Sequence, residues 1–135
     1  MNLALKIIMK LINLKFLLGI FFVFTLTIEA ANKVSFSNIS ELESGNLKIV
    51  FNLDKIALIN SYALDDPSRI VIDLKETSLK EQIKSQTFSP IRLIRASEVG
   101  STVRIVIEVK GAVYWKQPWQ VKHTARIDLV RETKR

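Results

Sequence analysis

Apolar and polar residues alternate along two stretches of the chain with the period of a β-strand. Residues 47–53 place four apolar side chains on one face: Leu47, Ile49, Phe51 and Leu53. Residues 103–109 repeat the pattern with another four: Val103, Ile105, Ile107 and Val109. Alternation of this kind, in segments rich in β-branched residues, predicts half-buried strands with one face on a core and the other toward solvent.

The pattern also indicates two related halves. The alternating segments begin 56 positions apart, and the tripeptide Ile72-Asp73-Leu74 has a counterpart 55 positions later, Ile127-Asp128-Leu129. A period near 55 that occurs only twice indicates a duplication inside one domain, because a solenoid needs three or more repeats. Turn-forming residues precede both alternating segments, at Ser44-Gly45-Asn46 and at Gly100-Ser101.

These patterns predict an all-β fold: a small β-sandwich of two related halves, each forming most of one sheet, with one short connecting helix. The helix is expected at about 78–85, because Ser78 and Glu81 have capping-box spacing and Leu79 and Ile83 would share a face. Either strand propensity or a covered outer surface would explain four valines at outward positions: Val50, Val71, Val106 and Val130.

The N-terminal residues have the features of a secretory signal peptide. Residues 16–28 are uncharged and mostly apolar, with lysines before them and Glu29-Ala30-Ala31 after them. This stretch is shorter than the about 20 apolar residues of a transmembrane helix, so we expect a signal helix over residues 1–31, cleaved after Ala30 or Ala31 and leaving no stable membrane span. An uncleaved anchor is the alternative, and Met9 would be a more ordinary start than Met1. Either way, residues 32–135 form an exported domain.

Composition excludes several kinds of site. The 135 residues include no Cys and one His, so neither a disulfide framework nor a zinc site with several His or Cys ligands can be built from this chain. No phosphate-binding glycine loop or nucleophile motif is present, and we expect no catalytic residue, metal or cofactor. Asp73 and Asp128 occupy equivalent positions, and a repeated structural role is a simpler account of them than a catalytic carboxylate pair.

The remaining chemistry is that of binding. The net charge is +7, and basic residues gather around 91–95 while aromatic residues gather at 114–119. Arginine forks bind carboxylates, and aromatic faces pack on the apolar faces of sugars. The candidate ligand-binding residues are therefore these six: Arg69, Arg92, Arg95, Arg104, Tyr114 and Trp119. Trp115 is expected in the core, Trp119 could instead cap a sheet edge, and the arginines could simply be solvated.

Three segments, in order, resemble the AMIN domain: Tyr62–Leu74, with Pro67 and Arg69 ahead of a Val-Ile-Asp-Leu strand; Ser89–Arg95; and Thr102–Val109. The resemblance covers about residues 34–130. It implies a small β-sandwich of two related halves without catalytic activity. It further implies a possible ligand contact at Arg69 and structural roles for Pro67 and Asp73.

The family is best known at the N-terminus of periplasmic N-acetylmuramoyl-L-alanine amidases, where it binds peptidoglycan, and it also occurs in type IV pilus secretins. The resemblance thus implies a periplasmic, non-enzymatic peptidoglycan-binding module whose partners include an amidase or a divisome or pilus protein. The alternative is a protein-interaction module of such a complex. The zinc domain of an amidase is missing after the last expected strand, which fits a free-standing module, a truncated amidase or a split gene. Export removes nucleic acid as a partner despite the positive charge.

Overall fold

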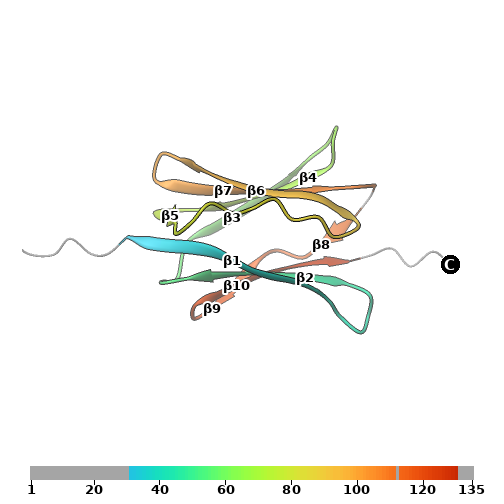
Figure 1. Cartoon of the computed structure of the whole chain (residues 1–135), viewed down its shortest axis with the longest axis horizontal. Helices are drawn as coiled ribbons and strands as arrows, with labels where there is room; N and C mark the ends of the chain where they lie inside the picture. The colour runs from blue at the N-terminus through green and yellow to red at the C-terminus, as the bar shows by residue number, and fades with distance from the viewer. Residues whose placement is uncertain (1–30, 112, 131–135) are drawn as a thin grey trace, which may run out of the picture. The chain divides into compact units, whose positions relative to one another are not determined.

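The computed structural model describes residues 31–111 and 113–130, which form ten strands and no helix. The strands are β1 (Asn32–Glu41), β2 (Leu47–Leu53), β3 (Ile59–Leu64), β4 (Arg69–Leu74), β5 (Thr77–Leu79), β6 (Ile91–Val99), β7 (Thr102–Val109), β8 (Tyr114–Trp115), β9 (Trp119–Val121) and β10 (Thr124–Val130). One sheet has the order β5-β1-β2-β10-β8, with β9 also paired to β10, and the other has the order β3-β4-β7-β6. The two sheets face each other as the layers of a sandwich (Figure 1).

The core lies between the sheets and is made by the apolar faces that the alternation predicts. All eight apolar residues of the two alternating segments are buried there. Strands β4 and β10 add the other large aliphatic side chains of the centre: Ile70, Ile72, Leu74, Ile127 and Leu129. Among the described residues this core cluster runs from Val34 to Leu129, so it lies inside the compact unit that spans residues 31–135.

The two halves exchange strands, which corrects the prediction that each half forms most of one sheet. β2 of the first half pairs with β10 of the second, and β7 of the second half pairs with β4 of the first. The equivalent pairs β2–β10 and β7–β4 thus form the centre of each sheet. Each sheet joins a hairpin of the first half to strands of the second, β1–β2 to β10 and β3–β4 to β7–β6. The physical reason is that this order places the strands with the most continuous apolar faces, β2, β10, β4 and β7, at the centres of the sheets, where they cover one another.

The predicted connecting helix at about 78–85 is wrong. Residues 77–79 form β5, which pairs in parallel with the start of β1, and residues 80–90 continue without a helix. The backbone N–H groups of Leu79 and Lys80 donate to the Glu98 carboxylate and to the Val34 carbonyl, so two donors that a helix start would leave without a partner in the helix have partners in the sandwich. Leu79 and Ile83 do pack on the core, as predicted, but from an extended chain.

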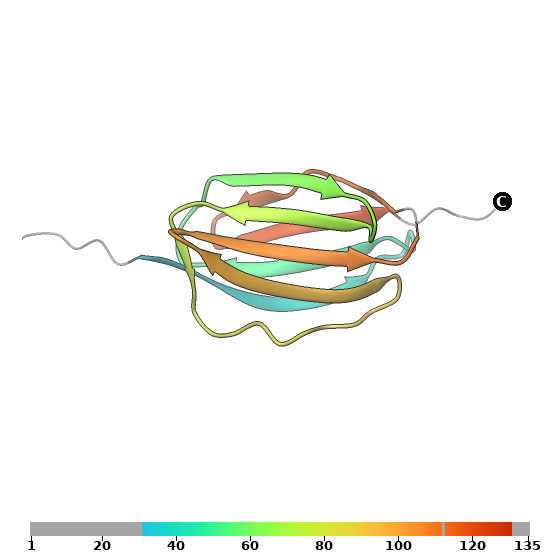
Figure 2. The same ribbon diagram turned by 90° about the horizontal axis from the view of Figure 1, so that it is seen from above.

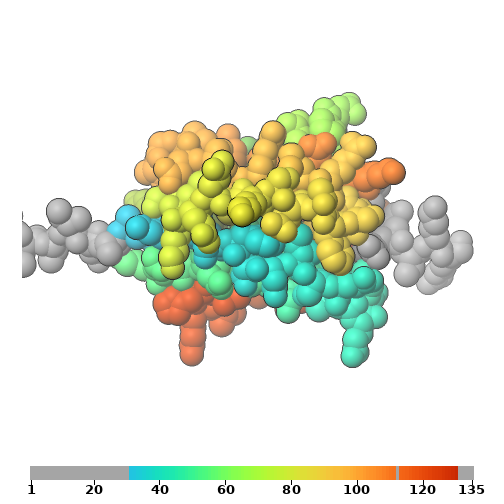
Figure 3. All heavy atoms as spheres, viewed as in Figure 1, coloured from blue at the N-terminus to red at the C-terminus, as the bar shows by residue number. Residues whose placement is uncertain are grey.

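The connector, residues 80–90, closes one side of the sandwich. It passes along the opening between β6 and β1, as both ribbon views and the space-filling view show (Figures 1, 2 and 3). Ile83 is its buried contact with the core, and Phe88 forms a bridge with Ile91 at its end. The connector thereby covers core side chains that the two edge strands leave open.

The predicted signal peptide and its alternative, an uncleaved anchor, lie outside the described residues and stay predictions. Within residues 31–111 and 113–130, no helix is long and apolar enough to cross a membrane.

Candidate functional site

Three of the predicted arginines occupy outward positions of the β3-β4-β7-β6 sheet. On β4, Ile70, Ile72 and Leu74 point into the core, so Arg69 and Asp73 point away from it. On β7 the same alternation turns Arg104 outward, opposite Asp73 in the register of the two strands. On β6, Ile94 is fully buried and Arg95 beside it is exposed, opposite Val106.

Arg92 joins the same surface through a β-bulge. The register of β6 against β7 shifts between Ile91 and Leu93, so that exposed Arg92 follows buried Ile91 and approaches Glu108, with 3.9 Å between its Nη1 and the carboxylate. Glu108 lies opposite Arg69 on the neighbouring strand. We name this surface the arginine face: the outward side of the sheet, carrying Arg69, Arg92, Arg95 and Arg104 with Asp73 and Glu108.

Arg104 is held by an ion pair. Its Nε and Nη2 donate to the two oxygens of Asp73 at 2.9 and 3.1 Å, a two-pronged contact between adjacent strands. These hydrogen bonds lower the pKa of Asp73 below its ordinary range, although burial of the carboxyl opposes the shift, and they raise the pKa of Arg104. Asp73 therefore has the structural role that the sequence indicates, and Arg104 is largely neutralised.

Arg69 and Arg95 carry the charge that remains. Among the described residues neither forms a salt bridge; the Arg69 Nε donates to the Pro67 carbonyl at 3.2 Å. The ion pair between Arg92 and Glu108 is weak, because the distance between the charged groups is long and the Arg92 side chain is well exposed. The positive potential of the arginine face is thus concentrated at Arg69 and Arg95.

An apolar row crosses the middle of the arginine face. Tyr62 pairs with Val71, Val71 with Val106, and Val106 with Arg95, so four outward side chains lie in line across four strands. Val71 is only 2% exposed although it points away from the main core, since the larger side chains around it cover it. The row presents a partly exposed aromatic ring and an aliphatic floor beside a guanidinium.

Tyr62 is the site residue that the sequence reasoning missed. It lies two positions before Leu64 in the strand that leads into the Asp65–Ser68 turn, and its partner after that turn is Val71. The turn and the alternation around it were both recognisable, so pairing the two strands across the turn would have placed Tyr62 beside the arginines.

The aromatic candidates lie elsewhere. Tyr114 and Trp119 belong to β8 and β9 of the other sheet, where Tyr114 pairs with Val130 and Trp119 with Arg126. The Arg126 guanidinium stacks over the Trp119 ring, 5.1 Å from its centroid. Trp115 packs against the core, as expected from the sequence. Trp119 is therefore not part of the arginine face.

Tyr114 does meet Arg69, at the end of the sandwich where β4 begins. A hollow of about 250 Å³ there is lined by residues of both sheets, including Leu64, Asp65, Arg69, Tyr114 and Trp115. A second hollow of about 340 Å³ lies beside Phe88, Arg92 and Lys110. Both are open surface depressions that adjoin arginines of the candidate set, so the arginine face continues into recesses of the size of a sugar or a short peptide.

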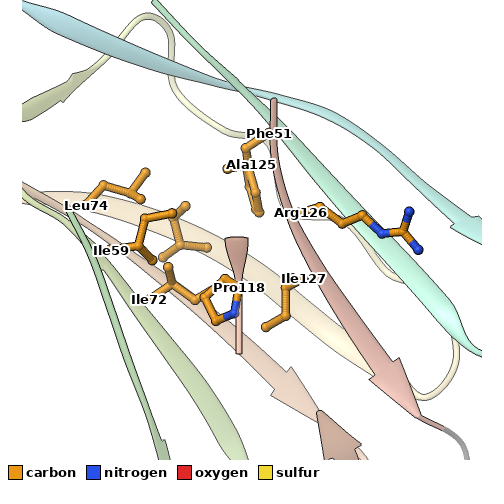
Figure 4. A pocket seen from close by; sticks show the side chains of 9 residues that line it. Phe51, Ile59, Ile72, Leu74, Pro118, Ala125, Arg126 and Ile127 are labelled. Atoms are coloured by element: carbon orange, nitrogen blue, oxygen red, sulfur yellow. The ribbon is translucent and has the colours of Figure 1, made fainter. Parts of the chain in front are cut away.

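A pocket between the two sheets of the described domain is far smaller. Between the sheets, Pro118 packs among Ile72 and Ile127, and the Arg126 guanidinium points away from them (Figure 4). The remaining void has a volume of about 10 Å³, which at most fits one water molecule.

The carboxylates provide structure. Asp128 accepts hydrogen bonds from Arg126 Nε and Nη2 at 2.7 and 3.0 Å, as Asp73 does from Arg104, and these bonds raise the pKa of Arg126. The two aspartates lie on the outward faces of opposite sheets and cannot act as a pair on one bond. Within the described part of the chain, no group of three His, Asp or Glu side chains is placed to hold a metal ion, and the His123 Nδ1 is 3.0 Å from the Leu53 carbonyl.

The structure is thus a two-sheet β-sandwich with arginines on the outer side of one sheet and with its two nearly buried aspartates, Asp73 and Asp128, held in ion pairs. A comparison with family profiles matches the AMIN domain over residues 38–132, most of the chain. The chain belongs to the AMIN domain family, which confirms the resemblance seen in the sequence. AMIN domains are non-catalytic domains, typical of envelope proteins, that bind peptidoglycan or target their proteins to it. A search of curated proteins finds no match to this chain.

Proposed function

We propose that the protein is a periplasmic, non-catalytic module that binds peptidoglycan through the arginine face and so positions wall remodelling. One observation carries the proposal: the four candidate arginines, which are scattered over residues 69–104, lie on the outward side of one sheet. Membership of the AMIN family supports the ligand class.

The chemistry of the face suits a peptide-substituted glycan. Arg95 and Arg69 offer guanidinium groups to the carboxylates of the stem peptides, as two-pronged, charge-assisted hydrogen bonds. Tyr62 and Val106, which are both partly exposed, offer apolar surface to the C–H face of a sugar ring, and buried Val71 lies between them. Arg104 acts indirectly, because its fork is already occupied by Asp73.

The test is co-sedimentation of the purified domain, residues 31–135, with insoluble sacculi at low and at physiological salt. We expect Arg95→Glu to weaken binding at least tenfold, since a charge-assisted bond is lost and the stem carboxylate is repelled. The matched control is Lys116→Glu, which makes the same change of charge at an exposed position outside the arginine face. Wild-type protein that stays in the supernatant, or equal losses in both variants, would contradict the proposal.

Export by the N-terminal segment belongs to the same proposal. Residues 1–31 would be removed after Ala30 or Ala31 and release the domain into the periplasm. The intact mass of the protein recovered from cells distinguishes a mature chain that begins at residue 31 or 32 from an uncleaved one. A mass that includes residues 16–28 would contradict cleavage and support the alternative, an uncleaved membrane anchor.

A protein partner is the second candidate function, and the edge of β6 favours it. β6 pairs with β7 along one edge. Along its other edge, the β-bridge that the described residues show is the isolated one between Phe88 and Ile91. An extended segment of an envelope protein could add to this edge beside Arg95. A photo-crosslinking amino acid at exposed Ser97 would capture such a partner in cells, whereas crosslinks to glycan alone would favour the first function.

A further inference from the structure

The end of the sandwich at which β1 begins collects several loops. These are the β2–β3 loop at 54–58, the β4–β5 turn at 75–76, the β6–β7 turn with its flanking strand residues at 99–102 and the β9–β10 turn with its flanking strand residues at 121–124, together with Asn32. They gather at the left in Figures 1 and 2, at the end opposite the one from which β10 leaves. We call this surface the entry end, because the chain enters the domain there.

The entry end exposes aliphatic side chains that contribute nothing to the core. Ile56 is 76% exposed, Leu58 is 74% exposed and Val121 is 62% exposed, the largest values of any aliphatic side chain in the described residues. Val99, in the neighbouring turn, is half exposed as well. Scattered single apolar residues are common on protein surfaces, but several on adjacent loops at one end form a contact surface.

The loops are held rigidly by polar contacts. The Gln120 side chain accepts from the Ala57 N–H at 2.9 Å and donates to the Lys55 and Lys122 carbonyls at 2.9 and 2.8 Å, so it joins the β2–β3 loop to the β9–β10 turn. Asn32 holds the other side of the loop, because its Oδ1 accepts a hydrogen bond from the Lys55 N–H at 2.8 Å. Ile56 and Val121 are thus presented to solvent by a fixed framework.

Lysines surround these apolar side chains. Lys33, Lys55, Lys75 and Lys122 are all exposed in or next to the same loops. The acidic residues in or next to the same loops are Asp54, Glu76 and Glu98, so four lysines stand against three carboxylates. Aliphatic tips ringed by lysines match the boundary of an anionic bilayer, where apolar side chains enter below the headgroups and lysines meet the phosphates.

The sequence before Asn32 points to the same partner. The uncharged stretch 16–28 is separated from Asn32 by three residues, which span roughly 10 Å at full extension. While that stretch is in a bilayer, as a signal sequence or as an anchor, the chain itself brings the entry end to the membrane surface.

We propose that the entry end docks on an anionic phospholipid bilayer, with Ile56, Leu58 and Val121 inserted at the headgroup boundary and Lys55 and Lys122 on lipid phosphates. The arginine face is the outward side of one sheet and the entry end is one end of the sandwich, so the two partners occupy different surfaces. The domain would thereby bind the wall from the surface of a membrane.

The test is co-sedimentation of residues 31–135 with vesicles of phosphatidylglycerol and phosphatidylethanolamine, and with vesicles of phosphatidylcholine alone. We expect binding to the anionic vesicles that falls with added salt, and at least fivefold weaker binding to the neutral ones. The double variant Ile56→Ser with Leu58→Ser should lose at least tenfold, and Lys122→Glu about tenfold. Both change exposed side chains, and a far-UV circular dichroism spectrum checks that the strands remain.

Two controls make the result specific. Tyr114→Ser removes a similarly exposed apolar side chain at the opposite end and should leave vesicle binding unchanged, and Lys116→Glu does the same for charge. The double variant should also bind sacculi like the wild type, which separates this inference from the proposed function. The inference would be overturned by wild-type protein that does not sediment with anionic vesicles. It would also be overturned by a double variant that binds these vesicles like the wild type, or by control variants that lose as much vesicle binding as the double variant.

Discussion

Asp73 and Asp128 show how a repeated residue can keep its role with different partners. Asp73 takes the arginine opposite it on the neighbouring strand, whereas the residue opposite Asp128 is Lys48, and Asp128 takes Arg126 of its own strand. The position equivalent to Arg126 in the first half is Val71. The second half therefore supplies both guanidinium groups, Arg104 and Arg126, one to each nearly buried carboxylate, because a guanidinium satisfies both oxygens at once and an ammonium does not.

Replacing Asp73 tests this role. Asp73→Asn should lower the free energy of unfolding by about 1–2 kcal/mol at pH 7, a discounted value since Arg104 is partly exposed. The pKa of Asp73 is lowered in the folded state, so its stabilisation is present above the unfolded pKa of about 3.9 and is lost as the pH falls through the folded pKa. Urea unfolding from pH 7 to pH 2 should show the difference between wild type and variant shrinking in acid.

The control for that experiment is Asp65→Asn, at an exposed position in the β3–β4 turn. It should change stability by less than about 0.5 kcal/mol at any pH. A difference between wild type and Asp73→Asn that stays constant down to pH 2 would mean that packing, and not the charge, accounts for the effect.

The direction in which a single side chain points could be predicted where the core-facing residues of its strand could be assigned. Alternation turns Arg104 outward on β7 as soon as Val103 and Ile105 are assigned to the core, and the structure agrees. Trp119 and Arg95 could not be assigned to different faces in this way, because which sheet a strand joins depends on pairing with residues far along the chain.

At the scale of the elements, the connector shows how a local helix pattern can fail. Ser78, Leu79 and Glu81 have helix-start spacing, yet a helix of two turns gains little by itself. The edge of β1 offers backbone partners to residues 77–79, and the open side of the sandwich needs to be covered along its length. An extended chain covers more length per residue than a helix, so tertiary contacts outweigh local propensity.

Ile83 is the side chain by which the connector holds to the core. Ile83→Ala should lower the free energy of unfolding by about 2 kcal/mol, since a buried aliphatic side chain is truncated at the border of the core. Native-state hydrogen exchange should show faster exchange at the β6 edge beside it. Exposed Lys84→Ala is the neighbouring control, and equal losses in the two variants would show that Ile83 adds nothing specific.

At the scale of the whole domain, the exchange of strands makes the halves interdependent. Each sheet has a β2–β10 or a β7–β4 pair at its centre, so neither half can complete a sheet alone. The duplication visible in the sequence is therefore a duplication of strands and not of independent folding units.

Fragments test this interdependence. Peptides 31–85 and 86–135 should each lack a stable strand spectrum in circular dichroism, while residues 31–135 should unfold in one cooperative transition. Mixing the two fragments should restore strand structure if their pairing surfaces are complementary. A stable fold in either fragment alone would show that its strands can pair within one half.

The sequence by itself determined the strand class, the duplication, the family and the outward direction of Arg104. These properties are local, because the two-residue period of a strand fixes which side chains share a face. Only the tertiary structure decided that the halves exchange strands, that the connector is extended and that Trp119 lies on the other sheet. These features depend on backbone pairing and packing between residues far apart in the sequence, 29 to 39 positions in the β4–β7 pair and 72 to 82 in the β2–β10 pair, and no local pattern encodes the choice among such partners.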